Sequence, residues 1–478
     1  MTEALYIQEK EFMIDKIFAI INQVVIVLVI LTMALQMIYS LFIFIPPKKY
    51  KKAKVQHKYA VLIAARNEES VIGYLIESLK QQNYPQELLD IFVVAHNCTD
   101  RTREIAEQAG ATVFVLNDDD PARKRKGYAL RHGFERLLKD YPDHEGYFVF
   151  DADNLVSPDF VAEMNNAFDS GAKVCQGFRN SKNLEKNAVA GVNGLFFLRD
   201  CVFNAHARTL IHSSPMIFGT GFLFAREVIA DTGWTAFNLA EDAEFSAQLV
   251  LKKYRNRYVA KAEFFDEQPT SFMQSMQRQS RVGRGTCQLF FKYGYKLLFK
   301  FFTRFRIAYL DTFLALMYAP VSLLCVVWFP FYYIYQPITM LVAGDMAALQ
   351  SFLIMIAQMV GLYILVPITL QNLLIYLFNW KRLKIKSVWK LILTLLFFPI
   401  YNFGCALAIT IGIINPKVKW KQVKHTESYS LEQMERKKAK NTANELPPPR
   451  RKLNSAVCSV RTAIAALPVK NLQRSFVL

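Results

Sequence analysis

Long apolar stretches lie near the N-terminus and in the C-terminal half of the chain. The first, at about residues 17–45, contains no charged residue, and a helix that crosses a bilayer needs roughly 20 such residues. Further apolar runs lie at about 307–335 and 349–379, and a last run at about 388–415 is interrupted by Pro399. This pattern predicts membrane-spanning helices on both sides of a longer polar region.

Basic residues predict the orientation of these helices, because short loops rich in Lys and Arg stay on the cytoplasmic side. The segment 48–58 reads KKYKKAKVQHK and places the end of the first span inside the cell, with the N-terminus outside. The loop 336–350 has no Lys or Arg and is expected outside, whereas the basic segment 379–390 is expected inside. The basic residues from Lys417 onward also favour the inside, so the last run either crosses or forms a re-entrant hairpin around Pro399. We prefer the crossing.

The region from about 59 to 268 alternates between two kinds of pattern. Short apolar runs typical of buried strands are separated by segments with the spacing of amphipathic helices. This alternation predicts an α/β domain with a mostly parallel sheet that helices cover on both faces. The predicted strands are 60–64, 90–95, 112–116 and 147–150, and the helices between them include 70–81, 102–109 and 127–138.

Polar, charged residues follow each of the four predicted strands. The segments are Ala65 to Glu69, His96 to Asp100, 117–127 (NDDDPARKRKG) and Asp151 to Asp153. Ligands on parallel sheets bind at the carboxyl ends of the strands. Each segment alone is typical of an ordinary loop, but four at one edge of a sheet predict a site. The chain has no glycine-rich dinucleotide fingerprint or P-loop, which disfavours dinucleotide-dependent oxidoreductases and P-loop ATPases.

Asp151 and Asp153 stand two residues apart at the end of an apolar strand. Side chains at this spacing point the same way in an extended chain, and like charges this close repel unless a positive charge lies beside them. One interpretation is a solvated turn or helix cap, because Ser157-Pro158-Asp159 follows. The other is a site for a hard divalent cation, Mg²⁺ or Mn²⁺, which prefers oxygen ligands together with substrate phosphates. The run 123–126 (RKRK) would then neutralise phosphate.

Composition favours a membrane partner. The chain has 478 residues, is 53% hydrophobic and carries a formal net charge of +18. With this apolar content, the charge indicates an anionic membrane surface and membrane lipids as partners, and no nucleic acid. The seven cysteines include no C-x-x-C pair, so we expect free thiols on a reducing, cytosolic face and no zinc site.

The segment 269–305 combines aromatic and basic residues at roughly helical spacing. Such a segment is typical of an amphipathic helix in the bilayer interface, although a core helix followed by the start of a span fits the same residues. Gly283, Gly285 and Gly294 are expected to break it into short helices. From about 425 onward the tail is polar and Pro-rich, and its composition predicts disorder.

At this point the motifs resemble the membrane-embedded, inverting glycosyltransferases of family 2, which have the GT-A fold and include hyaluronan, cellulose and poly-N-acetylglucosamine synthases. The similar landmarks follow one another over roughly 59–285. They are AARNEE, AHNCTDRT, KGYAL (Lys126 to Leu130), DADN (from Asp151), FGTG (Phe218 to Gly221), AEDAE (Ala240 to Glu244) and RQSRV (Arg278 to Val282). The resemblance implies a Rossmann-like α/β GT-A catalytic domain in the cytoplasm, combined with an α-helical transmembrane region.

The resemblance also implies roles for individual residues. Asp242 would be the general base, Asp153 would hold Mg²⁺ or Mn²⁺, and Arg281 would stabilise the departing diphosphate together with that ion. Without the resemblance, Asp242 is an ordinary acid in a first helical turn and Arg281 a lipid contact. The implied substrate-binding residues are Ala65, Arg66, Asn67, Glu68, Asn97, Lys126, Asp151, Gly219, Thr220 and Glu241.

The chain departs from the family pattern at four positions. His96 stands where an aspartate is common, which puts the nucleobase contact in question. Ala240 replaces a threonine. Arg278 and Val282 replace the glutamine and tryptophan of the Q-x-x-R-W motif. Because that tryptophan lines the acceptor sugar in the family, acceptor binding must differ here.

We therefore expect a membrane-bound inverting glycosyltransferase that transfers a sugar from a nucleotide-sugar donor, by analogy a UDP-sugar, to a growing polysaccharide. The alternative is transfer of a single sugar to a lipid or lipid-linked acceptor. A non-catalytic scaffold or transporter is disfavoured, because a decayed enzyme would not be expected to keep Asp151, Asp153, Asp242 and Arg281 together. By analogy we expect a multi-pass protein of the bacterial plasma membrane. The expected division is a transmembrane helix at 1–47, the catalytic domain at 48–268, interfacial helices at 269–306, two to three spans at 307–416 and a basic, disordered tail at 417–478.

Overall fold

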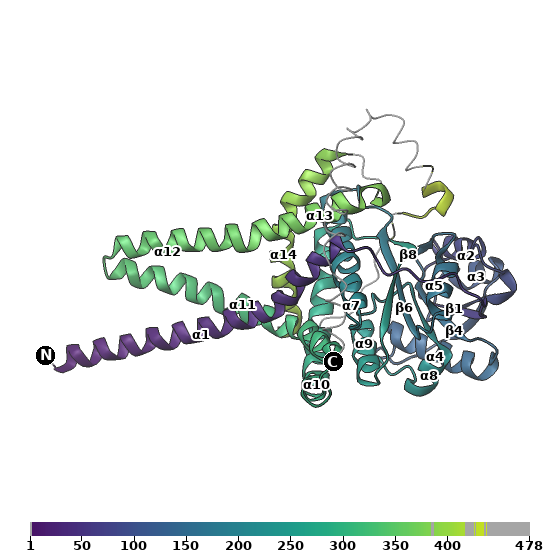
Figure 1. Cartoon of the computed structure of the whole chain (residues 1–478), viewed down its shortest axis with the longest axis horizontal. Helices are drawn as coiled ribbons and strands as arrows, with labels where there is room; N and C mark the ends of the chain where they lie inside the picture. Colours follow the sequence, from purple (N-terminus) through teal and green to yellow (C-terminus); the bar gives the residue numbers. More distant parts are fainter. Residues whose placement is uncertain (1, 384–386, 416–424, 426, 435, 437–478) are drawn as a thin grey trace.

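The computed structural model describes residues 2–383, 387–415, 425, 427–434 and 436. It contains an α/β domain built on an eight-stranded sheet in the order β3-β2-β1-β4-β7-β6-β8-β5. Long helices before and after this domain extend away from it to one side (Figure 1). The sheet domain and the extended helices correspond to the polar and apolar parts of the sequence.

The first half of the sheet is parallel. Each of its strands pairs in parallel with its neighbour, and the helices between them follow the predicted alternation. Near-continuous apolar runs suit these strands, because both faces of a parallel sheet are covered. The elements are β1 (Tyr59–Ala65), α2 (Ile72–Lys80), η2 (Gln86–Leu88), β2 (Leu89–His96), α3 (Thr102–Gln108), β3 (Thr112–Leu116), α4 (Lys126–Asp140) and β4 (Gly146–Asp151).

The second half of the sheet is mixed, so the expectation of a mostly parallel sheet holds for every pairing of the first half and for four of the seven pairings overall. The strand β7 runs antiparallel to both β4 and β6, β6 and β8 are parallel, and β5 pairs antiparallel with β8. Strands as short as β5 and β7 leave little periodicity in the sequence. The elements are β5 (Leu155–Val156), α5 (Phe160–Asp169), β6 (Val174–Ser181), α6 (Ala188–Arg199), η3 (Asp200–Ala205), α7 (His206–Leu210), β7 (Phe222–Ala225), α8 (Arg226–Thr232), α9 (Glu241–Leu251) and β8 (Asn256–Asp266).

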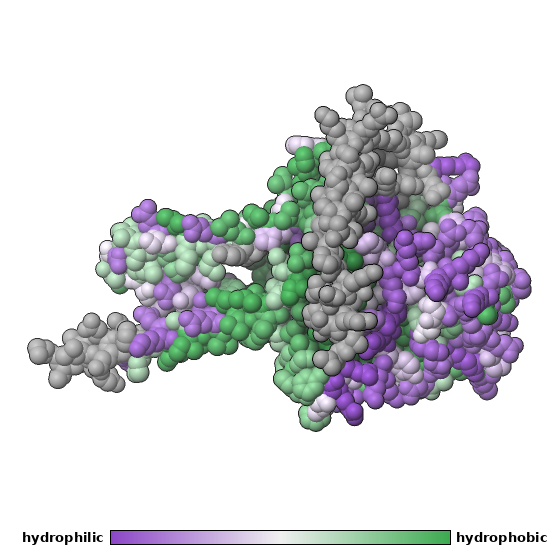
Figure 2. Space-filling view, viewed as in Figure 1, coloured by the Kyte–Doolittle hydropathy of each residue, from purple (hydrophilic) through white to green (hydrophobic). Residues whose placement is uncertain are grey.

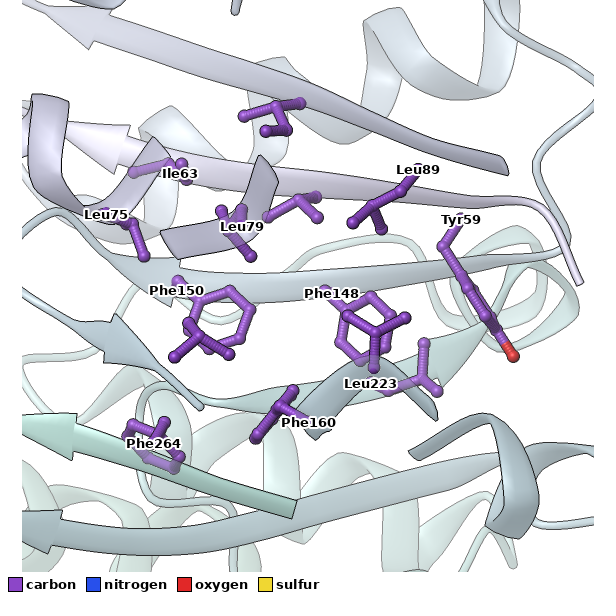
Figure 3. Close-up of a cluster of buried hydrophobic side chains, with 14 of the residues drawn as sticks. Tyr59, Ile63, Leu75, Leu79, Leu89, Phe148, Phe150, Phe160, Leu223 and Phe264 are labelled. Atoms are coloured by element: carbon purple, nitrogen blue, oxygen red, sulfur yellow. The ribbon is translucent and has the colours of Figure 1, made fainter. Parts of the chain in front are cut away.

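Apolar side chains cover both faces of the sheet. Figure 3 shows one of these layers, in which Phe148 and Phe150 of β4 and Phe264 of β8 lie against Phe160 of α5. A second buried cluster on the other face joins α4, α8 and α9 to the same strands. Burying residues of this size removes about 1.5–3 kcal/mol of unfavourable hydration each. The two layers fix the sheet, and its strand ends then position the loops described below.

Among the described residues, four helices outside the sheet domain are long and apolar enough to cross a membrane. Figure 2 shows apolar residues gathered over these extended helices and polar residues over the sheet domain. Their candidate spans are Met13–Phe44, Ile307–Val342, Met346–Trp380 and Val388–Ile414. The elements are α1 (Thr2–Leu41), η1 (Phe42–Phe44), α11 (Ile307–Val342), α12 (Met346–Gln358), η4 (Met359–Leu365), α13 (Val366–Leu383) and α14 (Val388–Ile414).

The helix α14 continues through Pro399, so no re-entrant hairpin forms there. The helix α10 (Phe272–Arg304) is likewise a single helix, and the prediction that its glycines break it is wrong. A Cβ on Gly283 would lie 2.8 Å from the Cα of Ile409, and one on Gly412 would overlap the carbonyl oxygen of Ser280. Glycine costs a helix interior about 0.5–1 kcal/mol. Here that cost is offset by the close backbone packing of α10 on α14.

Residues 425, 427–434 and 436, which the composition placed in a disordered tail, lie against the sheet domain. Leu431 and Met434 are buried among residues of β5 and β8. The local sequence is polar overall, and its three apolar side chains were too few for a prediction based on composition to indicate an ordered segment. The other residues of the predicted tail, including the basic positions from Lys417 to Lys424, lie outside the described residues.

Candidate active site

Hydrogen bonds join the loops that follow β1 and β2 at the carboxyl edge of the sheet. Asn67 and Asn97 adopt left-handed backbone conformations, with φ of 56° and 51°, which asparagine tolerates better than most residues. The Asn67 Oδ1 accepts a hydrogen bond from the backbone N–H of Thr99 at 2.8 Å. The Asn97 side chain donates to the carbonyl of Asp118 at 2.9 Å. Two of the predicted donor-site motifs therefore form one turn system.

His96 lies buried under this turn system. Burial, and then the positive charge of Arg66, lower the pKa of His96 to about 4, so its imidazole is neutral. The Nε2 atom of this ring has no hydrogen-bond partner among the described residues. A neutral ring therefore stands where the family commonly has a carboxylate.

Lys126 joins the donor-side and acceptor-side motifs. It opens α4, and its Nζ pairs with the Asp151 Oδ1 at the end of β4. The same Nζ donates to the carbonyl oxygen of Gly219 at 2.7 Å. Gly219 has a φ of 82°, which a residue with a side chain rarely adopts. One ammonium group thus connects the KGYAL, DADN and FGTG segments.

A hydrogen-bond chain under Asp151 extends to the second aspartate. The Asp151 backbone N–H donates to the Thr220 Oγ1 at 2.9 Å, and that hydroxyl donates to the Asn154 Oδ1. The Asn154 amide donates in turn to the Asp266 Oδ1 at 3.0 Å and to the Asp153 Oδ1 at 3.2 Å. Thr220 is therefore a support of the DADN turn.

Asp242 lies in the first turn of α9 and faces this arrangement. A Cβ on Gly219 would stand 3.2 Å from the Asp242 Oδ2, so the carboxylate lies directly against the turn that Lys126 binds. Burial raises the pKa of Asp242, while the N–H of Ala243, Lys126 and Arg281 act in the opposite direction. A carboxylate with a raised pKa next to basic groups is suited to accept a proton.

The other two acidic residues in the first turn of α9, Glu241 and Glu244, have different roles. Burial, and then the charge of Asp242, raise the pKa of Glu241. Glu244 points away from the site and accepts the backbone N–H groups of Phe237 and Asn238, each at 2.9 Å. It also pairs with Lys292 of α10 at 2.7 Å. Glu244 is therefore structural, and it holds the loop before α9 against α10.

Asp153 belongs to a group of possible metal ligands that the sequence did not reveal. One ligand atom each of Asp153, Glu267 and His425 lies within 4.8 Å of the others. Burial, and then the charge of Asp266, raise the pKa of Asp153 to about 8, so this carboxylate lacks a sufficient compensating charge. Carboxylate oxygens and an imidazole are ligands that Mn²⁺ accepts. These residues therefore fit a divalent cation.

His425 is surrounded by carboxylates. Its Nε2 lies 2.7 Å from the Glu68 Oε2, and its Nδ1 lies 3.2 Å from the Glu267 Oε2 and 3.9 Å from the Asp153 Oδ2. Burial alone would lower the pKa of His425, but the hydrogen bonds to Glu267 and Glu68 raise it to about 10. This residue could not be predicted from the sequence, because a lone histidine in a polar tail has no motif around it.

Two further residues that the sequence reasoning missed hold the FGTG segment. The Arg179 guanidinium forms a buried ion pair with Asp266 and donates to the Phe218 carbonyl at 2.9 Å. The Gln176 side chain accepts from the Phe218 N–H at 3.0 Å and donates to the Thr220 carbonyl at 3.0 Å. Both residues lie on β6, which sequence periodicity did not identify.

The first and fourth residues of the RQSRV segment lie at different places. Arg278 faces α6 and α14, where the Asn193 Oδ1 accepts from Arg278, from Ser275 at 2.9 Å and from Tyr401 at 2.7 Å. Arg281 lies close enough to Asp242 and Glu241 to lower the pKa of both. The structure thus brings together one set of the predicted site residues, which are Lys126, Asp151, Gly219, Thr220, Glu241, Asp242 and Arg281. A second set lies along the same edge of the sheet and consists of Arg66, Asn67, Glu68, Asn97 and Asp153. Ala65 is the buried last residue of β1.

Comparison with known proteins identifies sequences similar to this chain. The family described as "Glycosyltransferase like family 2" matches residues 57–285. The "Probable glycosyltransferase YdaM" of Bacillus subtilis is 27% identical over 258 residues, which cover 52% of this chain and 59% of that protein. The "Beta-monoglucosyldiacylglycerol synthase" of a Synechocystis strain is 25% identical over 238 residues, which cover 49% of this chain and 48% of that protein. The chain thus spans about half the length of these curated relatives.

A solved structure has a similar fold. The mannosyltransferase PcManGT from Pyrobaculum calidifontis, in complex with GDP-Man and Mn²⁺, superposes with a TM-score of 0.52 at 15% sequence identity. The match covers 80% of this chain and 97% of that chain. Residues 57–285 therefore match a family 2 glycosyltransferase domain, and the sheet domain has a fold of the GT-A type. Four helices among the described residues are long and apolar enough to span a membrane.

Proposed function

We propose that this chain is a membrane-bound inverting glycosyltransferase that transfers one sugar from a nucleotide-sugar donor to a lipid or lipid-linked acceptor. The observation that carries the proposal is the meeting of two groups at Gly219. The Lys126 ammonium, which pairs with Asp151, binds the carbonyl of this residue at 2.7 Å. The Asp242 carboxylate lies against the same residue.

The donor would bind along the carboxyl edge of β1, β2 and β4. The Asn67 and Asn97 turns and the neutral His96 would accommodate the nucleotide, by analogy a uridine diphosphate. Asp151 and Lys126 would orient the sugar and its diphosphate. Asp153 would hold Mg²⁺ or Mn²⁺, which supplies positive charge for the departing diphosphate, and Arg281 would add to that charge.

Asp242 would take the proton of the acceptor hydroxyl as that oxygen attacks the anomeric carbon. General-base help of this kind is worth about 10²–10⁴-fold in rate. Attack from the face opposite the diphosphate inverts the anomeric configuration. Arg281 and Lys126 lie close enough to Asp242 to favour its charged form, which keeps part of the carboxylate available despite burial.

Three observations favour a lipid or lipid-linked acceptor. Val282 stands where a tryptophan would line an acceptor sugar. The helices α10 and α14 pack backbone to backbone at Ser280 and Gly412, which leaves no room for a polymer between them at that level. The relatives include a protein named as a glucosyldiacylglycerol synthase and one named as a 4,4'-diaponeurosporenoate glycosyltransferase. A membrane lipid could reach Asp242 along the helices that flank the domain.

A growing polysaccharide is the second candidate acceptor. It is favoured by the complete series of motifs and by candidate spans on both sides of the domain, as in the polysaccharide synthases that the sequence resembles. In both cases we propose a multi-pass protein of the cell membrane. The basic segment 48–58 supports a catalytic domain on the cytoplasmic side.

The product distinguishes these acceptors. The full chain, purified in detergent with added membrane lipids, is given a panel of radiolabelled nucleotide sugars with Mg²⁺ or Mn²⁺. We expect label from one donor in an organic-extractable product that carries a single sugar. Label in large, water-soluble product would support the polysaccharide instead.

Two variants serve as controls for this experiment. Asp242→Asn should form no labelled product, whereas Glu135→Gln, on the exposed surface of α4, should match wild type. Failure of the wild-type chain to transfer label from any donor would contradict the proposed function.

A further inference from the structure

Residues 425, 427–434 and 436 form a segment, called here the C-terminal strap, that lies over the metal-ligand group. Tyr429, Leu431 and Met434 are buried with Leu155 of β5 and Phe265 of β8. In Figure 1 the strap is the short yellow-green helix beside α2 and β8. Because β8 ends at Asp266, the strap covers the end of the strand that leads directly into Glu267.

Polar contacts fix the strap at further points. Glu427 pairs with Lys186 at 2.7 Å, and the Tyr429 hydroxyl donates to the Lys182 carbonyl at 3.4 Å. Lys182 and Lys186 follow β6, whereas Leu155 follows the DADN turn. The strap is therefore attached on both sides of the carboxylate group, and His425 lies at its beginning.

The His425 imidazole is oriented as a metal ligand would be. Its Nε2 lies 2.7 Å from the Glu68 carboxylate, and a hydrogen bond from that nitrogen fixes the ring and directs the Nδ1 toward Glu267 and Asp153. Histidines that bind metals almost always donate their other N–H to a carboxylate or carbonyl in this way. Binding of a divalent cation at the Nδ1 would displace the proton that this nitrogen shares with Glu267.

The carboxylates that face the Nδ1 are themselves enclosed. The Glu267 side chain is 6% exposed and that of His425 is 12% exposed. Taking a carboxylate out of water is costly unless a cation or several hydrogen bonds compensate for it. The enclosure therefore points to a cation shared by the strap and the sheet domain.

We propose that His425 and Glu267 are ligands, together with Asp153, of the divalent cation used by this glycosyltransferase, and that the strap closes the site when the cation binds. This inference rests on the proposed function, because it extends the metal site of that reaction. A ligand carried on the strap makes closure and cation binding reciprocal, so each strengthens the other.

The direct test is Mn²⁺ binding to the full chain in detergent, without donor. Free Mn²⁺ is quantified by electron paramagnetic resonance, and pulsed measurements detect a ¹⁴N nucleus bound to the ion. We expect one Mn²⁺ with ¹⁴N modulation in wild type. In His425→Ala and His425→Gln we expect binding at least about tenfold weaker, since even residues supporting a ligand contribute 10–100-fold, and no modulation.

Three further variants complete the test. Glu267→Gln should weaken binding and keep the ¹⁴N modulation, and Asp153→Asn should lose most binding. His132→Gln, on α4, should match wild type in both measurements. The thermal unfolding of every variant is also measured in the absence of metal, so that loss of the His425 ion pairs with Glu68 and Glu267 is distinguished from loss of Mn²⁺ binding.

Three results would overturn the proposal. They are a wild-type chain that binds no Mn²⁺, a wild-type chain that binds Mn²⁺ without ¹⁴N modulation, and a His425→Ala variant that keeps both Mn²⁺ binding and ¹⁴N modulation. A chain that binds Mn²⁺ through His425 and transfers no sugar would contradict the proposed function and leave this inference standing.

Discussion

Arg208 and Asp311 form a buried, two-pronged ion pair between the sheet domain and a candidate membrane span. The Arg208 Nε and the Asp311 Oδ2 are 2.8 Å apart, and the second contact is 2.9 Å. The Ser213 hydroxyl donates to the same carboxylate at 2.7 Å, and the Tyr39 ring of α1 lies 5.3 Å from the guanidinium. One charge cluster therefore ties α7 to both α1 and α11.

Removing one partner of this pair should destabilise the chain strongly. Asp311→Asn leaves the Arg208 charge buried without a counter-charge, which typically costs about 3–5 kcal/mol. The measurement is thermal unfolding in detergent. The matched control is Asp140→Asn, which removes an exposed pair with Arg136 and should change stability by at most about 1 kcal/mol. Equal shifts in the two variants would show that the buried pair does not hold the domain to the helices.

Lys126→Met should weaken donor binding. The variant removes the charged hydrogen bonds of this residue to Asp151 and to the Gly219 carbonyl. We propose that Lys126 also contacts the donor diphosphate, and a hydrogen bond to a charged group contributes about 1.5–3 kcal/mol. We therefore expect nucleotide affinity to fall about 10–100-fold, measured by calorimetry with UDP and Mg²⁺. Lys139→Met, in the exposed last turn of α4, should bind like wild type. Unchanged affinity in Lys126→Met would remove this residue from the donor site.

The pH dependence of transfer should report on Asp242. The base must be ionised to accept a proton, so kcat/KM is present above the pKa of Asp242 and is lost as the pH falls through it. Because burial raises that pKa, the acidic limb should lie above the range of an ordinary carboxyl group. The profile is measured at saturating Mg²⁺, so that Asp153 stays ionised. An acidic limb in the ordinary carboxyl range, or the same limb in the residual activity of Asp242→Asn, would contradict this assignment.

A change in the anchor of the C-terminal strap should affect the metal site from a distance. Met434 is 2% exposed and belongs to the apolar cluster with Leu155 and Phe265. Loss of a buried methionine side chain costs about 2–5 kcal/mol, so Met434→Ser should release the strap and lower the Mn²⁺ affinity measured by electron paramagnetic resonance. Glu432, two residues away, has a side chain that is 70% exposed, and Glu432→Ser should leave the affinity unchanged. Equal affinities in the two variants would separate the strap from the metal site.

The sequence predicted the parts of the fold that have a regular pattern. The strands 59–65, 89–96 and 146–151 are almost wholly buried, and 112–116 is a partly exposed strand at the edge of the sheet. The apolar runs of all four are visible without a structure. The long helices without charged residues can equally be recognised in the sequence. The strands β5 and β7 are too short for such a pattern, so the mixed half of the sheet could not be foreseen.

The candidate site was predictable to the extent that it lies in motifs. Lys126, Asp151 and Asp242 belong to segments with a family resemblance, and the structure brings them together. Arg179 and Glu267 support or extend the site from strands that the pattern did not reveal. His425 reaches it from a segment more than 150 residues beyond Asp242 in the chain, and no local pattern records a contact of that kind.

The most direct test of the account compares wild type, Asp242→Asn and Glu135→Gln for donor binding and for sugar transfer in the same detergent preparation. We expect all three proteins to bind the nucleotide sugar with similar affinity. We also expect Asp242→Asn to lose transfer by about 10²–10⁴-fold, the contribution of a general base, and Glu135→Gln to transfer like wild type. Transfer by Asp242→Asn at the wild-type rate would contradict the central claim that this carboxylate, held against Gly219 opposite Lys126, accepts the proton of the acceptor.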